Sequence, residues 1–138
     1  MLTRRAFAFC ALCAASGLMA TEGAAAEAAA APSGVARTIL QQTEGPSDGY
    51  VTILARAEIQ AGMMVMRHTH PGIESSYILA GGGTLLVKGQ PDRLLSAGDG
   101  FQVAPYTPHA LRNGDSITRV ASTYVIEKGK PLASPAPE

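Results

Sequence analysis

Two of the three histidines in the 138-residue chain, His68 and His70, are separated by one residue, and Glu74 follows four residues after His70. Residues 63–70 are apolar at first, carry no helix-capping signal and end at Pro71-Gly72, which predicts a β-strand that enters a turn. Side chains alternate along a strand, so both imidazoles are expected on one face. The turn would return Glu74 on the neighbouring strand. Imidazole and carboxylate groups together suit a first-row divalent metal.

The third histidine, His109, lies far along the chain, among strand and turn residues at 104–113. A fold that brought it beside His68 and His70 would complete a site of three histidines and one glutamate. A histidine without such a role is more often a core or a surface residue. The local pattern therefore leaves both interpretations open.

The segment that holds the first two histidines resembles the first sequence motif of the cupin family. That motif is a glycine, five residues, His-x-His, three residues, a glutamate, six residues and a glycine. Its positions are filled, with every spacing kept, by Gly62, His68, His70, Glu74 and Gly81. The resemblance is to the small single-domain members, and it covers nearly all of the chain after the N-terminal segment.

The second cupin motif is matched at Gly98, His109 and Asn113, with Ala104 in place of the usual proline and Tyr106 in place of the usual glycine. Tyr106 is the one candidate catalytic residue: its side chain would cover the pocket mouth or donate a proton or hydrogen bond to a ligand. The alternative is a surface turn residue whose backbone has relaxed away from positive φ. Asn113 is expected to make structural hydrogen bonds in a turn.

The resemblance implies an all-β protein, a double-stranded β-helix or jelly-roll barrel. It also implies that the metal ligands are His68, His70, Glu74 and His109. Four protein ligands leave one or two positions free on a five- or six-coordinate metal, which favours Fe, Mn or Ni over Zn. An open position is what distinguishes a catalytic from a structural site. The resemblance to small cupins further suggests a homodimer.

The apolar neighbours of the histidines are expected to make the pocket dry. Met64 and Met66 share the predicted face of His68 and His70, and Ile78 and Phe101 are further candidates. Tyr77 and Tyr124 are interpreted as ordinary strand residues. The alternative for the methionines is plain core filling, which is the common role of this flexible side chain.

The rest of the chain reads as short strands separated by Gly, Pro, Asp and Asn, with no convincing helical periodicity. Many short strands at regular spacing predict a sandwich or a barrel. The barrel domain is placed at residues 32–127, and residues 128–138 are expected to form an irregular Pro-rich tail. The predicted strands are residues 37–43, 51–59, 63–70, 75–80, 84–88, 93–96, 101–104, 109–113 and 116–127.

Residues 1–31 are interpreted as an export signal followed by an Ala-rich spacer. Arg4 and Arg5 precede an apolar run at 6–15, which resembles a twin-arginine signal; the alternative is a general secretory signal with an accidental arginine pair. Either interpretation predicts a periplasmic or secreted protein that has no membrane association after signal removal. Cys10 and Cys13 both lie in this segment, so no disulfide is expected in the exported domain.

Composition narrows the function classes. Lys plus Arg and Asp plus Glu each total 11, so no basic face for nucleic acid is indicated, and the absence of Trp weakens a sugar-binding role. The first hypothesis is a metal-dependent enzyme that oxidises a small organic molecule in a dioxygenase-like reaction. The alternative is a non-catalytic cupin that binds a metal or a small ligand, which the lack of further acid–base residues favours. The fold alone does not decide between them.

Overall fold

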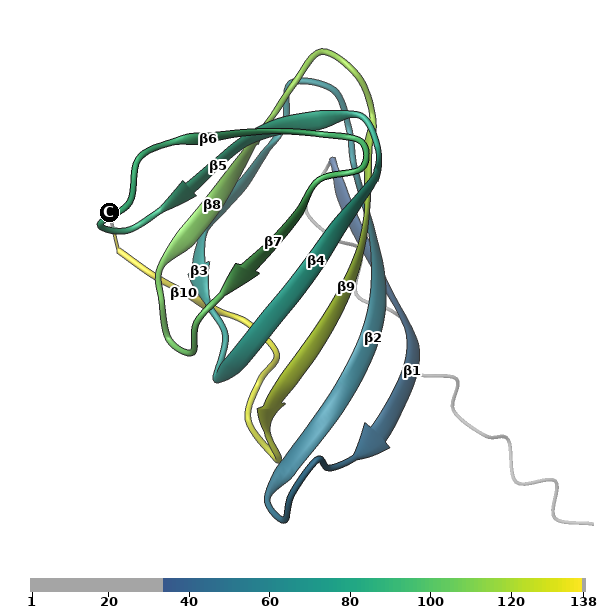
Figure 1. Ribbon diagram of the computed structural model, residues 1–138, viewed down its shortest axis with the longest axis vertical. Helices are drawn as coiled ribbons and strands as arrows, with labels where there is room; N and C mark the ends of the chain where they lie inside the picture. Colours follow the sequence, from purple (N-terminus) through teal and green to yellow (C-terminus); the bar gives the residue numbers. More distant parts are fainter. Residues whose placement is uncertain (1–33, 138) are drawn as a thin grey trace, which may run out of the picture.

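The computed structural model describes residues 34–137, which form two antiparallel five-stranded sheets that face each other (Figure 1). In spatial order the first sheet contains β1 (Val35–Glu44), β2 (Tyr50–Ile59), β9 (Thr118–Glu127), β4 (Gly72–Ala80) and β7 (Gly100–Val103). The second sheet contains β10 (Ser134–Pro135), β3 (Met64–Thr69), β8 (His109–Asn113), β5 (Gly82–Val87) and β6 (Arg93–Ser96).

All nine segments predicted as strands are strands, and the all-β, jelly-roll type of fold is confirmed. Within residues 34–137 the chain forms no helix, and hence none that is long and apolar enough to cross a membrane. The interpretation of residues 1–31 as an export signal falls outside the described residues. Buried and exposed side chains alternate along β2, β4 and β9. The buried ones lie on the face of the first sheet that packs against the second.

Two apolar clusters form the core. The first lies between the sheets and joins side chains of β2, β4 and β9 to side chains of β5, β6 and β8: Ile59, Ile78, Val120, Leu85, Leu95 and Leu111. The second lies on the inner face of β2 and β9 and is covered by Leu132 of the C-terminal segment: Val51, Ile53, Ala55, Tyr124 and Ile126. Between them, β4 and β9 carry Glu74, Ser76 and Ser122, all buried.

Asn113 connects the turns at one end of the barrel. Its Nδ2 donates to the carbonyl oxygens of Ile59, Gln60 and Ser116, and its Oδ1 accepts from Thr118 Oγ1 at 2.6 Å. The structural role predicted for Asn113 is therefore confirmed. Gly81, nearby, has φ of +74°, and a Cβ there would lie 2.5 Å from a backbone oxygen, which explains the glycine.

The prediction that Met64 and Met66 share the face of the histidines is wrong. In the pairing of β3 with β8, Val65 lies opposite Leu111, and the next matched pair is His68 with His109, so β3 contains one extra residue. Such a β-bulge shifts the side-chain alternation by one. Val65 consequently faces the interior with His68, whereas Met66 is 67% exposed.

The C-terminal segment is largely irregular, as predicted, but it includes the short strand β10. It turns back after β9, and β10 pairs with the end of β3, where Ser134 lies opposite Thr69 and Pro135 opposite His68 (Figure 1). A proline cannot donate to a ladder and is tolerated at a sheet edge, where β10 lies. The sequence did not predict this pairing for two reasons. The segment is rich in proline, and its partner strand lies some 65 positions away in sequence.

Candidate metal centre

The four predicted ligands lie together between the two sheets. His68 is on β3, His70 immediately follows β3, Glu74 is on β4 and His109 begins β8. One potential ligand atom from each of them lies within 4.8 Å of the others. His70, Glu74 and His109 are 2%, 6% and 3% exposed, and His68 is partly buried. The four residues that the cupin resemblance implied as ligands therefore lie close together in the structure.

Glu74 reaches the cluster from the opposite sheet. We expected it on the strand next to the histidines, but β4 pairs with β9 and β7, whereas β3 pairs with β8 and β10. His68 and His109 are the direct cross-strand pair. The Pro71-Gly72 turn therefore carries the chain from one sheet to the other, and the cluster bridges the two sheets.

Backbone carbonyls orient all three imidazole rings. In each histidine the Nδ1 atom is the one that lies beside a carbonyl oxygen. The distances are 2.8 Å from His68 to Met66, 2.6 Å from His70 to Leu132 and 2.9 Å from His109 to Thr107. A carbonyl oxygen only accepts, so Nδ1 must carry the proton. In the neutral imidazoles each Nε2 is then left with a free lone pair, the state that binds a metal.

The Nε2 atoms face a carboxylate oxygen. Glu74 Oε2 lies 3.0 Å from His70 Nε2 and 3.1 Å from His109 Nε2. The His70 Nε2 atom is buried and, despite this short distance, has no partner with hydrogen-bond geometry among the described residues. Lone pairs that face each other at this distance repel unless a proton or a metal cation lies between them. In the metal-free protein the hydrogen bond of 3.1 Å between His109 Nε2 and Glu74 Oε2 places a proton there. The donor set therefore fits a divalent metal held by His68, His70, Glu74 and His109.

A short chain of hydroxyls supports the carboxylate. Glu74 Oε1 accepts a hydrogen bond of 2.6 Å from Ser76 Oγ, which lies 2.6 Å from Ser122 Oγ. Burial by itself would raise the pKa of Glu74, but the contacts with His109, His70 and Ser76 outweigh it and hold the pKa well below its usual range. Glu74 therefore remains ionised at neutral pH, as a carboxylate ligand must.

A cavity of about 50 Å³ adjoins the cluster. Its walls are largely apolar and include the predicted Phe101, while Ile78 belongs to the first core cluster. Tyr124 was interpreted as an ordinary strand residue, but it lines the cavity with its ring centroid 4.8 Å from that of His70. Burial, followed by the charge of Glu74, raises the pKa of Tyr124, so its hydroxyl stays protonated and can donate.

Arg37 also lines this cavity, and the sequence gave no reason to select it. The side chains of β1 after Val35 are exposed on both faces, so no alternation marks an inward residue there. Its position follows from register, because Arg37 lies opposite Ala57 of β2, which also lines the cavity. Sequence analysis missed this residue, an arginine at a position of an edge strand that faces the interior.

Tyr106, the candidate catalytic residue, is 51% exposed, and its hydroxyl contacts Glu127 and accepts a 2.9 Å hydrogen bond from Lys130 Nζ. Its φ of +57° shows that the backbone has not relaxed away from the left-handed region. The contact with the cluster is through the main chain, because the Tyr106 amide donates to the His70 carbonyl at 2.8 Å. The hydroxyl itself is directed towards the C-terminal segment.

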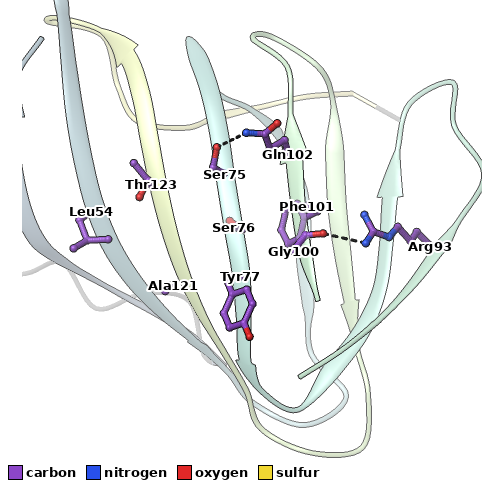
Figure 2. Close-up of a pocket in the computed structure, with 10 residues that line it drawn as sticks. All are labelled: Leu54, Ser75, Ser76, Tyr77, Arg93, Gly100, Phe101, Gln102, Ala121 and Thr123. Carbon is purple, nitrogen blue, oxygen red and sulfur yellow. Dashed lines mark hydrogen bonds between the residues drawn. The ribbon is translucent and has the colours of Figure 1, made fainter. Parts of the chain in front are cut away.

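A larger, open depression lies on the first sheet, at β4 and β7 (Figure 2). Gln102 donates to Ser75 there, and Arg93 donates to the carbonyl of Gly100. Its lining contains no histidine and no carboxylate. The chemistry is therefore concentrated in the smaller interior cavity rather than in this larger surface depression.

Two facing antiparallel sheets with a three-histidine, one-carboxylate cluster between them define a jelly-roll protein with an interior metal-type site. Residues 55–126, more than half of the chain, match the Cupin domain family. The chain belongs to this family. No curated protein matches it by sequence.

Solved structures with the same fold include enzymes. The DMSP lyase DddQ from Ruegeria pomeroyi is 27% identical, with a TM-score of 0.64 over 75% of this chain and 52% of the lyase. A cupin-2 domain from Rhodospirillum rubrum is 18% identical, with a TM-score of 0.60 over 76% of this chain and 67% of that one. A salicylate 1,2-dioxygenase from Pseudaminobacter salicylatoxidans is 18% identical, with a TM-score of 0.56 over 71% and 28%. The chain spans about half the length of the lyase, and the two likenesses at 18% show the fold alone.

Protonation of His68 is expected to destabilise the metal-free protein. Burial, followed by the proximity of His109, lowers the pKa of His68 from 6.5 to about 4. The unfolded chain therefore binds more protons between these values, and stability falls as pH decreases from about 6.5 to about 4. Urea unfolding with a chelator present should show the midpoint falling more steeply over this window in the wild type than in His68→Gln. Equal slopes would contradict the shift.

Removal of the C-terminal segment is expected to weaken metal binding. A chain ending at Lys130 loses the Leu132 carbonyl that fixes the His70 ring, together with β10. Loss of such an orienting partner typically costs roughly 10–100-fold in metal affinity. Competition with a chromophoric chelator measures this, and a chain ending at Ala136 is the control that retains both contacts. Equal affinity of the two truncated chains would show that the segment does not position His70.

Proposed function

We propose that the protein is a metal-dependent enzyme that acts on a small organic molecule in a dioxygenase-like oxidation. The observation that carries the proposal is the proximity of one potential ligand atom from each of three histidines and one glutamate, all within 4.8 Å of one another, with the buried His70 Nε2 lacking a hydrogen-bond partner among the described residues. Bound there, a divalent metal supplies Lewis-acid polarisation of a substrate oxygen.

The chain's own residues prepare this site. The backbone carbonyls hold the imidazole lone pairs inward, and Ser76 and Ser122 hold the carboxylate. The apolar walls exclude water, which strengthens electrostatic interactions with a bound substrate. The protonated hydroxyl of Tyr124, next to His70, is the available proton or hydrogen-bond donor.

We favour Fe, Mn or Ni over Zn. Four protein ligands already complete the tetrahedral shell that Zn prefers, whereas a five- or six-coordinate metal retains a position for substrate. Export in the folded state through the twin-arginine route supports the same choice, because the metal would be selected in the cytoplasm rather than by affinity alone.

Two observations support other functions. The small volume of the cavity, about 50 Å³, favours the non-catalytic binding of a metal or a small ligand. The 27% identity to a DMSP lyase favours a bond cleavage that needs no oxygen. An oxidation requires oxygen, whereas the cleavage does not, so the oxygen dependence of turnover distinguishes these two reactions. If neither the oxidation nor the cleavage substrates are turned over, the non-catalytic binding function is favoured.

Metal content tests the proposal directly. Purified protein should contain roughly one Fe, Mn or Ni per chain by mass spectrometry, and His68→Ala and His109→Ala should lose it because each removes a ligand. Met66→Ala, an exposed neighbour on β3, is the control and should retain the metal. Oxygen uptake with a panel of small aromatic and aliphatic acids should then follow metal content. A metal-free wild type, or metal retained in both histidine variants, would contradict the proposal.

The proposed location is the periplasm or the exterior of the cell, supported by the Arg4-Arg5 pair and the apolar run after it. Changing both arginines to lysine should retain the precursor in the cytoplasm, as measured by fractionation and immunoblotting. Unchanged export would favour a general secretory signal.

The homodimer stays a prediction, to be checked by light scattering. The exposed Leu54, Tyr77 and Leu79 on the first sheet are compatible with it.

A further inference from the structure

Arg37 places a positive charge beside the metal cavity. The cavity that His68, Glu74 and His109 line is also lined by Arg37. Its guanidinium carbon lies 5.9 Å from the centroid of the Tyr124 ring, within the range of a cation–π interaction. The strand between them, β2, carries only the small Ala55 and Ala57 on the inward register there. A long side chain on β1 can therefore cross β2 and reach Tyr124 on β9.

The guanidinium has no anionic partner within the described part of the chain. Three other cations are paired, Arg119 with Glu58 at 2.9 Å, Lys128 with Glu44 at 2.8 Å and Lys130 with Glu127 at 2.7 Å. Arg56 on β2 also has no ion pair among the described residues, but unlike Arg37 it does not line the cavity. No ion pair and no side-chain hydrogen bond among residues 34–137 involves Arg37. Its five N–H groups remain available to a ligand.

The charge balance of the cavity favours an anion. Glu74 is the only acidic residue in the lining, and it is already engaged by the histidines and Ser76. With a divalent cation held by the cluster, Glu74 and Arg37 together leave an excess of positive charge next to apolar walls. An organic anion that binds between the exposed Arg37 and the buried cluster would neutralise this excess.

The shape of the cavity limits the body of such an anion. It has a volume of about 50 Å³, and its walls include Ile59, Val65, Phe101, Leu111 and Val120. This space suits a short apolar group rather than a sugar or a nucleotide. A carboxylate matches the planar guanidinium, because two parallel N–H···O bonds can form between them.

We propose that the site selects a small organic carboxylate, whose carboxylate group binds Arg37 at the edge of the cavity while its apolar body points to the three-histidine cluster. Arg37 is then the residue that determines specificity. The inference rests on the proposed function for the bound metal, which supplies the excess positive charge, and for which end of the ligand reacts. The position of the anion site follows from Arg37 and the cavity.

Isothermal titration calorimetry with matched ligands tests the proposal. The full-chain protein, with its metal content measured, is titrated with propionate and butyrate and with their neutral isosteres propionamide and butyramide, whose short bodies suit a cavity of about 50 Å³. We expect the carboxylates to bind more tightly than the amides. Arg37→Gln should weaken carboxylate binding roughly 10–100-fold, the effect of one charge-assisted interaction, and leave amide binding unchanged. Arg37→Lys should recover part of the loss.

Arg56→Gln is the matched control, because Arg56 neighbours Ala55 and Ala57 on β2, is exposed and is not part of the cavity lining. It should bind both ligand types as the wild type does. Equal binding of carboxylates and amides, no carboxylate binding, or no effect of Arg37→Gln would overturn the proposal. Metal content distinguishes failure of the carboxylate proposal from failure of the proposed function. Arg37→Gln should retain the metal, because Arg37 is not a ligand. A metal-free wild type would instead contradict the metalloenzyme proposal.

Discussion

The hydrogen bonds from three imidazole Nδ1 atoms to backbone carbonyls are the constraint on which the site depends. A histidine ring can flip and can exchange its tautomer, and a carbonyl acceptor removes both freedoms at once. The three carbonyls belong to separate parts of the chain: β3 itself, the segment before β8 and the C-terminal segment after β9. The direction of the lone pairs is therefore a property of the whole barrel rather than of the motif alone.

At this site, polar side chains replace apolar ones on the inner face of the first sheet. On β4 two of the inward positions are the polar Glu74 and Ser76, whereas the outward Ile73, Tyr77 and Leu79 are exposed. This is the reverse of the usual arrangement, with apolar residues inside and polar residues outside. Buried polar groups are tolerated only when they are bonded, and the Ser122–Ser76–Glu74 chain meets that condition. The apolar clusters on either side supply the packing that the centre lacks.

Sequence patterns predicted the strands well, because these depend on spacing within short segments. The four clustered residues followed from the resemblance to the two cupin motifs, since the local pattern alone left the role of His109 open. The patterns failed where the outcome depends on how distant segments pair. The extra residue in β3 turned Met66 outward and Val65 inward, against a regular alternation. The inward position of Arg37 needed the register of β1 on β2, and the role of Leu132 needed a strand too short and too rich in proline to be recognised.

The bond between His70 and Leu132 joins residues 62 positions apart, and the acceptor follows β9 in the chain. During synthesis, the ring of His70 therefore has no acceptor until all the strands from β1 to β9 have been translated. A nascent chain that already contains the complete His-x-His motif still lacks the group that fixes one of its lone pairs. The order of the segments thus makes full orientation of the site a step that comes well after synthesis of the motif.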